Sequence, residues 1–290
     1  RLAAFFAGLF YLLNLGTLQT FYIPFETFTW FYAVLPWLLY LTIIYLNHPT
    51  RKNFIFLTLT LLFSAPAFYV QTLFLVFLIT LIPFFLPLLR GRPRGGLLLI
   101  SYLLLLLATQ GYWLLPNLYF TLTSSSTTTN ALQNQISTPE IILRNQEYGR
   151  FQDVVLLKRF NFDYTDLGPS DKFEIMMGPW NNHLNHPAIQ TIGYLFFTLT
   201  LIGLFYSLKR KLPYTLPLTF IFLLSLFFLI NLNSPTQSIF QFLQNHFPLL
   251  RQFFRSVFTK WSLPAALSYS LFFSVGVVFL LDLFSFLHSH

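Results

Sequence analysis

Long apolar runs are the feature that most restricts how this chain can fold. A helix that spans a membrane needs about 20 largely apolar residues, and six runs meet that requirement. They occupy residues 2–21, 29–46, 96–115, 190–208, 213–232 and 262–287. Only 9% of the residues are charged, whereas a soluble domain carries about 25%. We therefore expect an all-α integral membrane protein that contacts the lipid bilayer over much of its surface.

The run at residues 54–89 is too long for one crossing. A single helix over it would be about 54 Å long, whereas the hydrocarbon core is roughly 30 Å thick. Pro66, in the stretch "SAPAF", supplies a break because proline lacks a backbone donor and disfavours helix at the preceding residue. We therefore predict two spans here, 54–65 and 68–89, and about eight transmembrane helices in all.

Basic residues support this count. With eight spans, the connections "NHPTRKN", "RGRPRG" and "KRK" all fall on one face of the membrane and contain no acidic residue. The positive-inside rule assigns such loops to the cytoplasm. We therefore read the net charge of +8 as membrane topology and contact with anionic lipids. The composition does not predict a nucleic-acid partner.

The sequence suggests three segments. Residues 1–115 would form transmembrane helices 1–5, and residues 190–290 would form helices 6–8 with an interfacial helix at about 238–258. Between them, residues 116–189 are polar and contain seven of the nine acidic residues. We expect this middle segment to be an extracytoplasmic cap between spans five and six, on the outer face of a cell membrane. Its stretch 141–164 is predicted to form a short helix or a pair of strands.

The stretch "FPLLRQFFRSVFTKW", residues 247–261, places Arg251, Arg255 and Lys260 among aromatic residues. Arg251 and Arg255 are four residues apart, which would put them on one helical face. One interpretation is an interfacial anchor, with the rings in lipid and the cations at headgroup depth. The other is a phosphate site, because guanidinium and ammonium groups bind phosphate oxygens well. Positive charge is also disfavoured in short outer loops, so a bound anion would explain it.

Three further residues are candidates for chemistry. Glu26 lies in the first outer loop, where it would act as a base or bind a sugar hydroxyl, or would simply favour the start of the next helix. His183 and His186 are three residues apart and are weak candidates for metal ligands, although the asparagines and the proline around them favour an irregular loop. The chain has no cysteine, which excludes disulfides and thiolate chemistry.

Two amide side chains have a structural interpretation. Asn14 and Gln110 lie inside apolar runs. We expect their side chains to form hydrogen bonds between helices, as polar residues in membrane helices commonly do.

Several segments resemble one family of enzymes. The segment "FPLLRQFFRSVFTKWSLPAALSYSLFFSVGV" resembles the last conserved loop and span of GT-C type, polyprenyl-phosphate-dependent membrane glycosyltransferases, a group that includes arabinofuranosyltransferase-like and related bacterial multi-span proteins. "GYWLLPNLYF", "LNLGTLQTFYIPFETFTWFYAVLPWLLYL" and "DVVLLKRFNFDY" resemble other parts of the same family. Arg255 and Lys260 match the cations of its Phe-Arg-x-Pro-x-Lys-Phe element. Here the proline is absent, and the interval between the two cations is one residue longer.

The resemblance implies transfer of a sugar from a polyprenyl-phosphate donor to a glycan acceptor in the cell envelope. Arg251, Arg255 and Lys260 would then bind the donor phosphate, and use of a divalent metal ion stays open. In this family the catalytic base is an Asp or Glu of the first outer loop. We expect that part to lie upstream of Arg1, so that the chain would be a middle or C-terminal fragment. The alternatives are a transporter or flippase of lipid-linked saccharides, and a structural membrane protein without catalytic activity.

Overall fold

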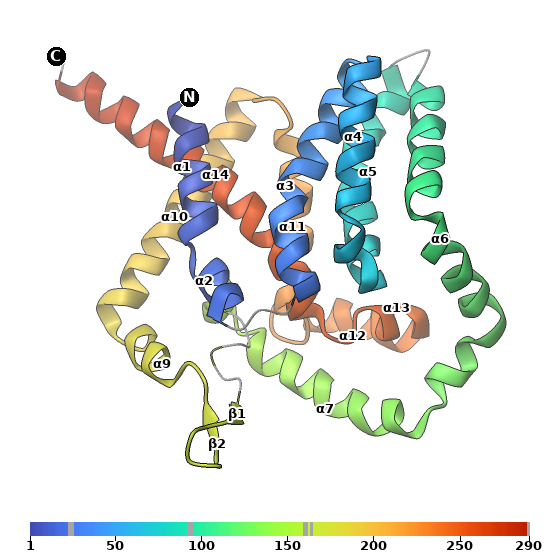
Figure 1. The fold of residues 1–290 in the computed structure, drawn as a ribbon. Coiled ribbons are helices and arrows are strands. Elements are labelled where there is room, and N and C mark those ends of the chain that lie inside the picture. The colour runs from blue at the N-terminus through green and yellow to red at the C-terminus, as the bar shows by residue number, and fades with distance from the viewer. Residues whose placement is uncertain (23–25, 92–94, 159–161, 163–164, 289–290) are drawn as a thin grey trace. The chain divides into compact units, whose positions relative to one another are not determined.

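The computed structural model describes residues 1–22, 26–91, 95–158, 162 and 165–288. Almost all of them lie in helices (Figure 1), which confirms the predicted all-α class. The chain divides into two compact units. Unit 1 contains residues 1–24, 144–246 and 256–290, and unit 2 contains residues 25–143 and 247–255. The middle segment predicted from the sequence, 116–189, is therefore divided between the two units.

Every predicted span falls on a helix, but these helices differ in length. Among the described residues, four are long and apolar enough to cross a membrane. They are α3 (Glu26–Asn47), α6 (Gly95–Thr129), α10 (Pro187–Arg210) and α14 (Val257–His288). A fifth candidate is the pair α1 (Leu2–Leu13) and α2 (Leu15–Tyr22), which is bent by 41°. The described helices thus supply four or five crossings by length and composition, rather than eight.

The predicted break at Pro66 is present. Helix α4 (Arg51–Phe63) ends there, a 3-10 turn, η1 (Ala65–Tyr69), follows, and α5 (Gln71–Gly91) begins after it. The Thr50 side chain caps the start of α4 by accepting a hydrogen bond of 3.2 Å from the Asn53 backbone N–H. Proline at the start of η1 is tolerated because the N–H it lacks would have no partner in a first turn.

Within unit 2, α3, α4, α5 and the first half of α6 pack through η1 and through polar contacts between helices. The hydroxyls of Thr42 and Tyr102 lie 2.9 Å apart, which joins α3 to α6. The Gln110 amide donates a hydrogen bond of 2.9 Å to the Leu61 carbonyl, which joins α6 to α4. The predicted role of Gln110 between helices is therefore confirmed.

The polar middle segment is more helical than the sequence indicated. Helix α6 continues beyond the predicted span end at residue 115 to Thr129, with Pro116 inside it and non-helical backbone at Ser124. Helix α7 (Leu132–Tyr148) follows, and then the short α8 (Phe151–Val155). The strand pair lies after the expected stretch: β1 (Thr165–Leu167) and β2 (Phe173–Ile175) form an antiparallel hairpin. Residues 159–161 and 163–164, in the segment compared with the glycosyltransferases, lie outside the described residues.

Helix α14 is the centre of unit 1, and α1, α10 and α11 (Thr215–Ile230) all pack against it (Figure 1). Aromatic residues fill the contact, with Phe222, Tyr269 and Phe272 buried in one apolar cluster. Trp261, in the second turn of α14, is fully buried and stacks on Phe228 with ring centroids 4.4 Å apart. Side chains of this size bury the most apolar area per residue, so α14 carries much of the packing of unit 1.

The α10–α14 contact depends on two glycines. A Cβ atom added to Gly203 would collide with the backbone carbonyl of Phe272, and one added to Gly276 would collide with that of Leu199. The two backbones therefore touch, which is how small residues allow close packing of membrane helices.

Short elements complete unit 1. Helix α9 (Gly178–Leu184) precedes α10, and α12 (Gln237–His246) follows α11. Phe240 of α12 is fully buried. The Asn231 amide donates a hydrogen bond of 2.8 Å to the carbonyl of Asn145 near the end of α7, which fixes the loop after α11.

Candidate functional site

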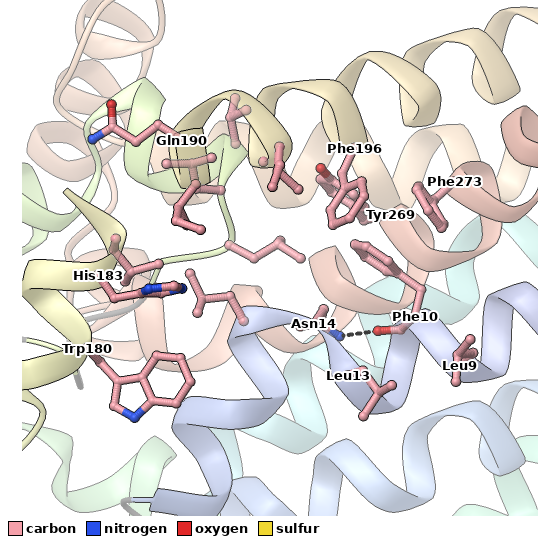
Figure 2. Close-up of a pocket in the computed structure, with 18 of the residues that line it drawn as sticks. Leu9, Phe10, Leu13, Asn14, Trp180, His183, Gln190, Phe196, Tyr269 and Phe273 are labelled. Carbon is pink, nitrogen blue, oxygen red and sulfur yellow. Dashed lines mark hydrogen bonds between the residues drawn. The ribbon is translucent and has the colours of Figure 1, made fainter. Parts of the chain in front are cut away.

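A cavity of about 480 Å³ lies within unit 1 (Figure 2). Pockets that hold small molecules usually measure about 300–1,000 Å³, so its volume suits a ligand. Its walls come from parts of the chain that are far apart in sequence, namely α1, residues 155–157, α9, the first half of α10, and α14.

One end of the cavity is aromatic. Phe10 of α1, Phe196 of α10, and Tyr269 and Phe273 of α14 meet there (Figure 2). The ring centroids of Phe10 and Phe273 are 4.3 Å apart and those of Phe196 and Phe273 are 5.4 Å apart. Phe10 also stacks on Tyr269 at 5.4 Å. Because three helices contribute to it, this cluster is a firm apolar wall.

The other end carries the polar groups. Trp180 and His183 of α9 and Gln190 of α10 lie there (Figure 2). The Trp180 indole makes edge-to-face contacts with His183 at 5.7 Å and with Tyr22 at 6.1 Å. Asn181 of the same helix donates a hydrogen bond of 2.8 Å to the Phe162 carbonyl. These contacts on both sides of Trp180 fix the position of α9 at this end.

Two local features shape the walls. Asn14 separates α1 from α2: its amide donates hydrogen bonds of 3.0 and 2.9 Å to the carbonyls of Phe10 and Tyr11, and its Oδ1 accepts one of 3.1 Å from the Thr17 N–H. The Asn14 amide also donates a hydrogen bond of 3.0 Å to the Thr17 hydroxyl of α2, so its bonds join two consecutive helices. Leu157 has left-handed backbone, with φ of 57°, which is uncommon for a leucine. Its carbonyl accepts a hydrogen bond of 3.1 Å from the Gln19 amide.

A glycine allows this wall to approach α10. A Cβ atom added to Gly193 would collide with the Leu156 side chain. Gly193 therefore lets the segment 155–157 lie directly against α10, where both line the cavity.

The lining is almost wholly apolar and carries no fixed charge. Of the lining residues in the described part of the chain, none is Lys, Arg, Asp or Glu, and the ionisable side chains among them are those of His183 and Tyr269. Apolar side chains also form an exposed rim: Leu13 of α1 is 73% exposed and Ile192 of α10 is 46% exposed. Exposed apolar surface of this kind is typical of sites that contact other proteins or lipid.

A second, much smaller cavity lies on the other side of Leu157. It measures about 20 Å³ and is lined by Tyr148, Val154, Leu157, Lys158, Leu229, Phe258 and Ser262. That volume is enough for about one water molecule. We therefore treat the larger cavity as the candidate site.

The structure gives the three predicted phosphate-binding cations separate surroundings. Arg251 is exposed in α13 (Pro248–Phe253). The Arg255 guanidinium donates a hydrogen bond of 2.8 Å to Asn134 Oδ1 in unit 2. Lys260 belongs to unit 1, is only 8% exposed, and donates a hydrogen bond of 3.0 Å from its Nζ to the Ser256 carbonyl. Neither cavity is lined by any of the three.

The segment predicted as an interfacial helix at about 238–258 contains two helices, α12 and α13, because Pro248 starts a new helix. Helix α13 then ends at Phe253, and the backbone turns before Arg255. The single helical face predicted for Arg251 and Arg255 is therefore not formed.

The other candidates also occupy distinct places. Glu26 is exposed in the first turn of α3, where a carboxylate favourably offsets the helix dipole. His186 caps α10, and its Nδ1 accepts a hydrogen bond of 3.3 Å from the Ala188 N–H. His183 lies in the preceding helix, α9, so the two histidines do not share one helical turn. In the described part of the chain, no group of three or more His, Cys, Asp or Glu residues is placed to hold a metal ion.

Comparisons with protein-family models, curated proteins and solved structures gave no match for this chain. The resemblance to membrane glycosyltransferases therefore rests on the sequence segments alone.

Sequence reasoning missed most of the cavity. The sequence suggests only a metal-ligand role for His183, and the aromatic residues of α1, α10 and α14 look like ordinary lipid-facing side chains in a chain that is 20% aromatic. The local signal that pointed toward the site was Trp180 beside asparagines and histidines in "GPWNNHLNHP", a polar stretch directly before an apolar run.

Proposed function

We propose that this chain belongs to a polytopic membrane glycosyltransferase that takes sugar from a polyprenyl-phosphate donor, and that its unit 1 cavity holds the hydrocarbon chain of a lipid-linked substrate. The observation that carries the proposal is the cavity itself. It is apolar, has an exposed apolar rim, and lies among helices of membrane-spanning character. The acceptor would be a glycan of the cell envelope.

The character of the cavity suits a lipid chain better than a water-soluble ligand. A chain that leaves the bilayer for an apolar cavity gains little from the hydrophobic effect, because lipid is equally apolar. It gains instead from dispersion contacts with rigid walls, which the aromatic end formed by Phe10, Phe196, Tyr269 and Phe273 provides. We therefore expect the cavity to retain one hydrocarbon chain of a lipid from the surrounding bilayer.

The proposed topology orients the two ends of the cavity relative to the membrane. With eight spans and the basic connections in the cytoplasm, Lys209 and Arg210 at the end of α10 are cytoplasmic, and α9 lies at the outer face. Gln190 and Phe196 are then separated by about 9 Å along α10. The polar end of the cavity would lie near the outer headgroups and the aromatic end deeper in the bilayer.

Lipid binding is tested by filling the cavity. Purified protein in nanodiscs is labelled with a photoactivatable prenyl alcohol, and the labelled peptides are mapped. Leu156→Trp places a larger side chain in the cavity wall, and we expect it to lower labelling about tenfold, or about 1.4 kcal/mol. Leu118→Trp is the matched control because Leu118 is exposed on α6 and lines neither cavity. Equal labelling in both variants would place the lipid elsewhere.

Sugar transfer is tested separately. Vesicles that contain the protein receive a polyprenyl phosphate with a radiolabelled sugar and an envelope glycan as acceptor. The proposal predicts label in the glycan. Label that stays on the lipid but changes leaflet would instead support the transporter or flippase.

A further inference from the structure

The charge of the cavity lining restricts the headgroup of its ligand. Among the described residues that line it, none is Lys or Arg. A phosphate taken out of water needs cationic or several N–H partners, because an uncompensated buried charge is very costly. The cavity therefore does not match the phosphate of a polyprenyl-phosphate donor.

The polar end offers indole, imidazole and amide groups instead. The Trp180 indole N–H, the His183 imidazole and the Gln190 amide line it from two successive helices. Within the described residues, no hydrogen bond uses these three groups, whereas the Asn14 amide is fully engaged in the α1–α2 junction. Indole, imidazole and amide groups together supply both donors and acceptors. They are thus suited to a ligand that has hydroxyls.

The aromatic face of Trp180 adds a second feature. Its edge-to-face contacts with His183 and Tyr22 hold the ring in place. A held indole offers a flat apolar surface beside a polar edge, which matches a sugar ring, whose C–H groups gather on its faces and whose hydroxyls lie around its rim. The opposite end is lined by the rings of Phe10, Phe196, Tyr269 and Phe273, so that end is left to the hydrocarbon chain.

We propose that the cavity binds an uncharged glycolipid, with its sugar at Trp180, His183 and Gln190 and its chain toward Phe10 and Phe273. This inference rests on the proposed function and deepens it: the lipid in this cavity would be the acceptor, and the phosphate-bearing donor would bind elsewhere.

The test compares three ligands of equal chain length: a prenyl alcohol, a prenyl phosphate and a prenyl glucoside. Each competes with the photoactivatable prenyl probe for protein in nanodiscs. The glucoside should displace the probe at about tenfold lower concentration than the other two, because one or two net hydrogen bonds correspond to roughly three- to tenfold each. His183→Ala and Trp180→Ala should abolish this preference and leave the alcohol within about twofold of its wild-type value.

His186→Ala is the matched control. His186 is also exposed and lies three residues away, but it does not line the cavity, so this variant should keep the preference for the glucoside. Tighter binding of the phosphate, or equal displacement by all three ligands, would overturn the glycolipid inference while lipid binding stands. Failure of all three ligands to displace the probe would refute the lipid site itself.

Discussion

Individual cations show how far residue type alone can mislead. Arg251, Arg255 and Lys260 are close in sequence, yet one is exposed, one is bonded to Asn134 and one is buried near the start of α14. The sequence correctly indicated cations among aromatic residues. It could not show that α13 would end at Phe253, because nothing in "RQFFRS" marks a helix end. Phosphate binding by these residues is therefore a prediction that needs its own test.

Arg255 and Asn134 allow that test. If Arg255 binds the donor phosphate, Arg255→Ala should lower sugar transfer at least tenfold, since charge-assisted hydrogen bonds contribute about 1.5–3 kcal/mol each. Asn134→Ala removes the partner but keeps the cation, so transfer should stay within about twofold of wild type. The radiolabel assay gives both rates, and fluorescence-detected size exclusion confirms folding. Equal losses in the two variants would give Arg255 a structural role only.

At the scale of elements, the sequence predicted helices well and their contacts poorly. Apolar runs and Pro66 located the helices and the break between α4 and α5, because length and proline chemistry are local properties. The extension of α6 through "SSSTTT" was missed, since Ser and Thr are poor helix formers whose preference can be overridden by packing. The cavity was missed for a different reason: its walls come from α1, α9, α10 and α14, and no local pattern reports that they meet.

The glycine crossing of α10 and α14 yields a sharp element-scale prediction. Gly203→Ala would drive a methyl group into the Phe272 carbonyl, and backbone cannot move aside as a side chain can. We expect a loss of about 1–3 kcal/mol or more in the free energy of unfolding, as overpacking generally costs. Unfolding in mixed micelles measures it.

Gly8→Ala is the control for that measurement. Gly8 lies in α1 with open space around the position of a Cβ atom, so alanine should be neutral or should stabilise the helix by up to about 1 kcal/mol. If both alanine variants unfold alike, α10 and α14 do not touch at backbone level.

For the whole molecule, the property to be measured is the number of membrane crossings. The described helices provide four or five long candidates, whereas the charge pattern favours eight crossings. Helices α4, α5 and α11 decide the difference, because they are apolar but short in the structure. The number of crossings therefore has to be read from the accessibility of the loops.

The absence of cysteine makes this measurement direct, because single cysteines can be introduced into the unaltered chain. We expect Ser170→Cys, in the hairpin loop, to react with a membrane-impermeant maleimide in intact cells. Arg51→Cys and Lys209→Cys should react only after permeabilisation. A reaction of Arg51→Cys and Lys209→Cys on opposite sides would remove the eight-span arrangement, because the two sites would then be separated by an odd number of crossings.

The backbone contact at Gly203 and Gly276 also has an evolutionary consequence. Substitution at either position is tolerated only if the neighbouring helix shifts, so selection should hold both sites to the smallest residue. The aromatic positions around the cavity can exchange one ring for another as ligands change. Descendants of this chain should therefore diverge faster at the aromatic positions around the cavity than at Gly203 and Gly276, which do not line it.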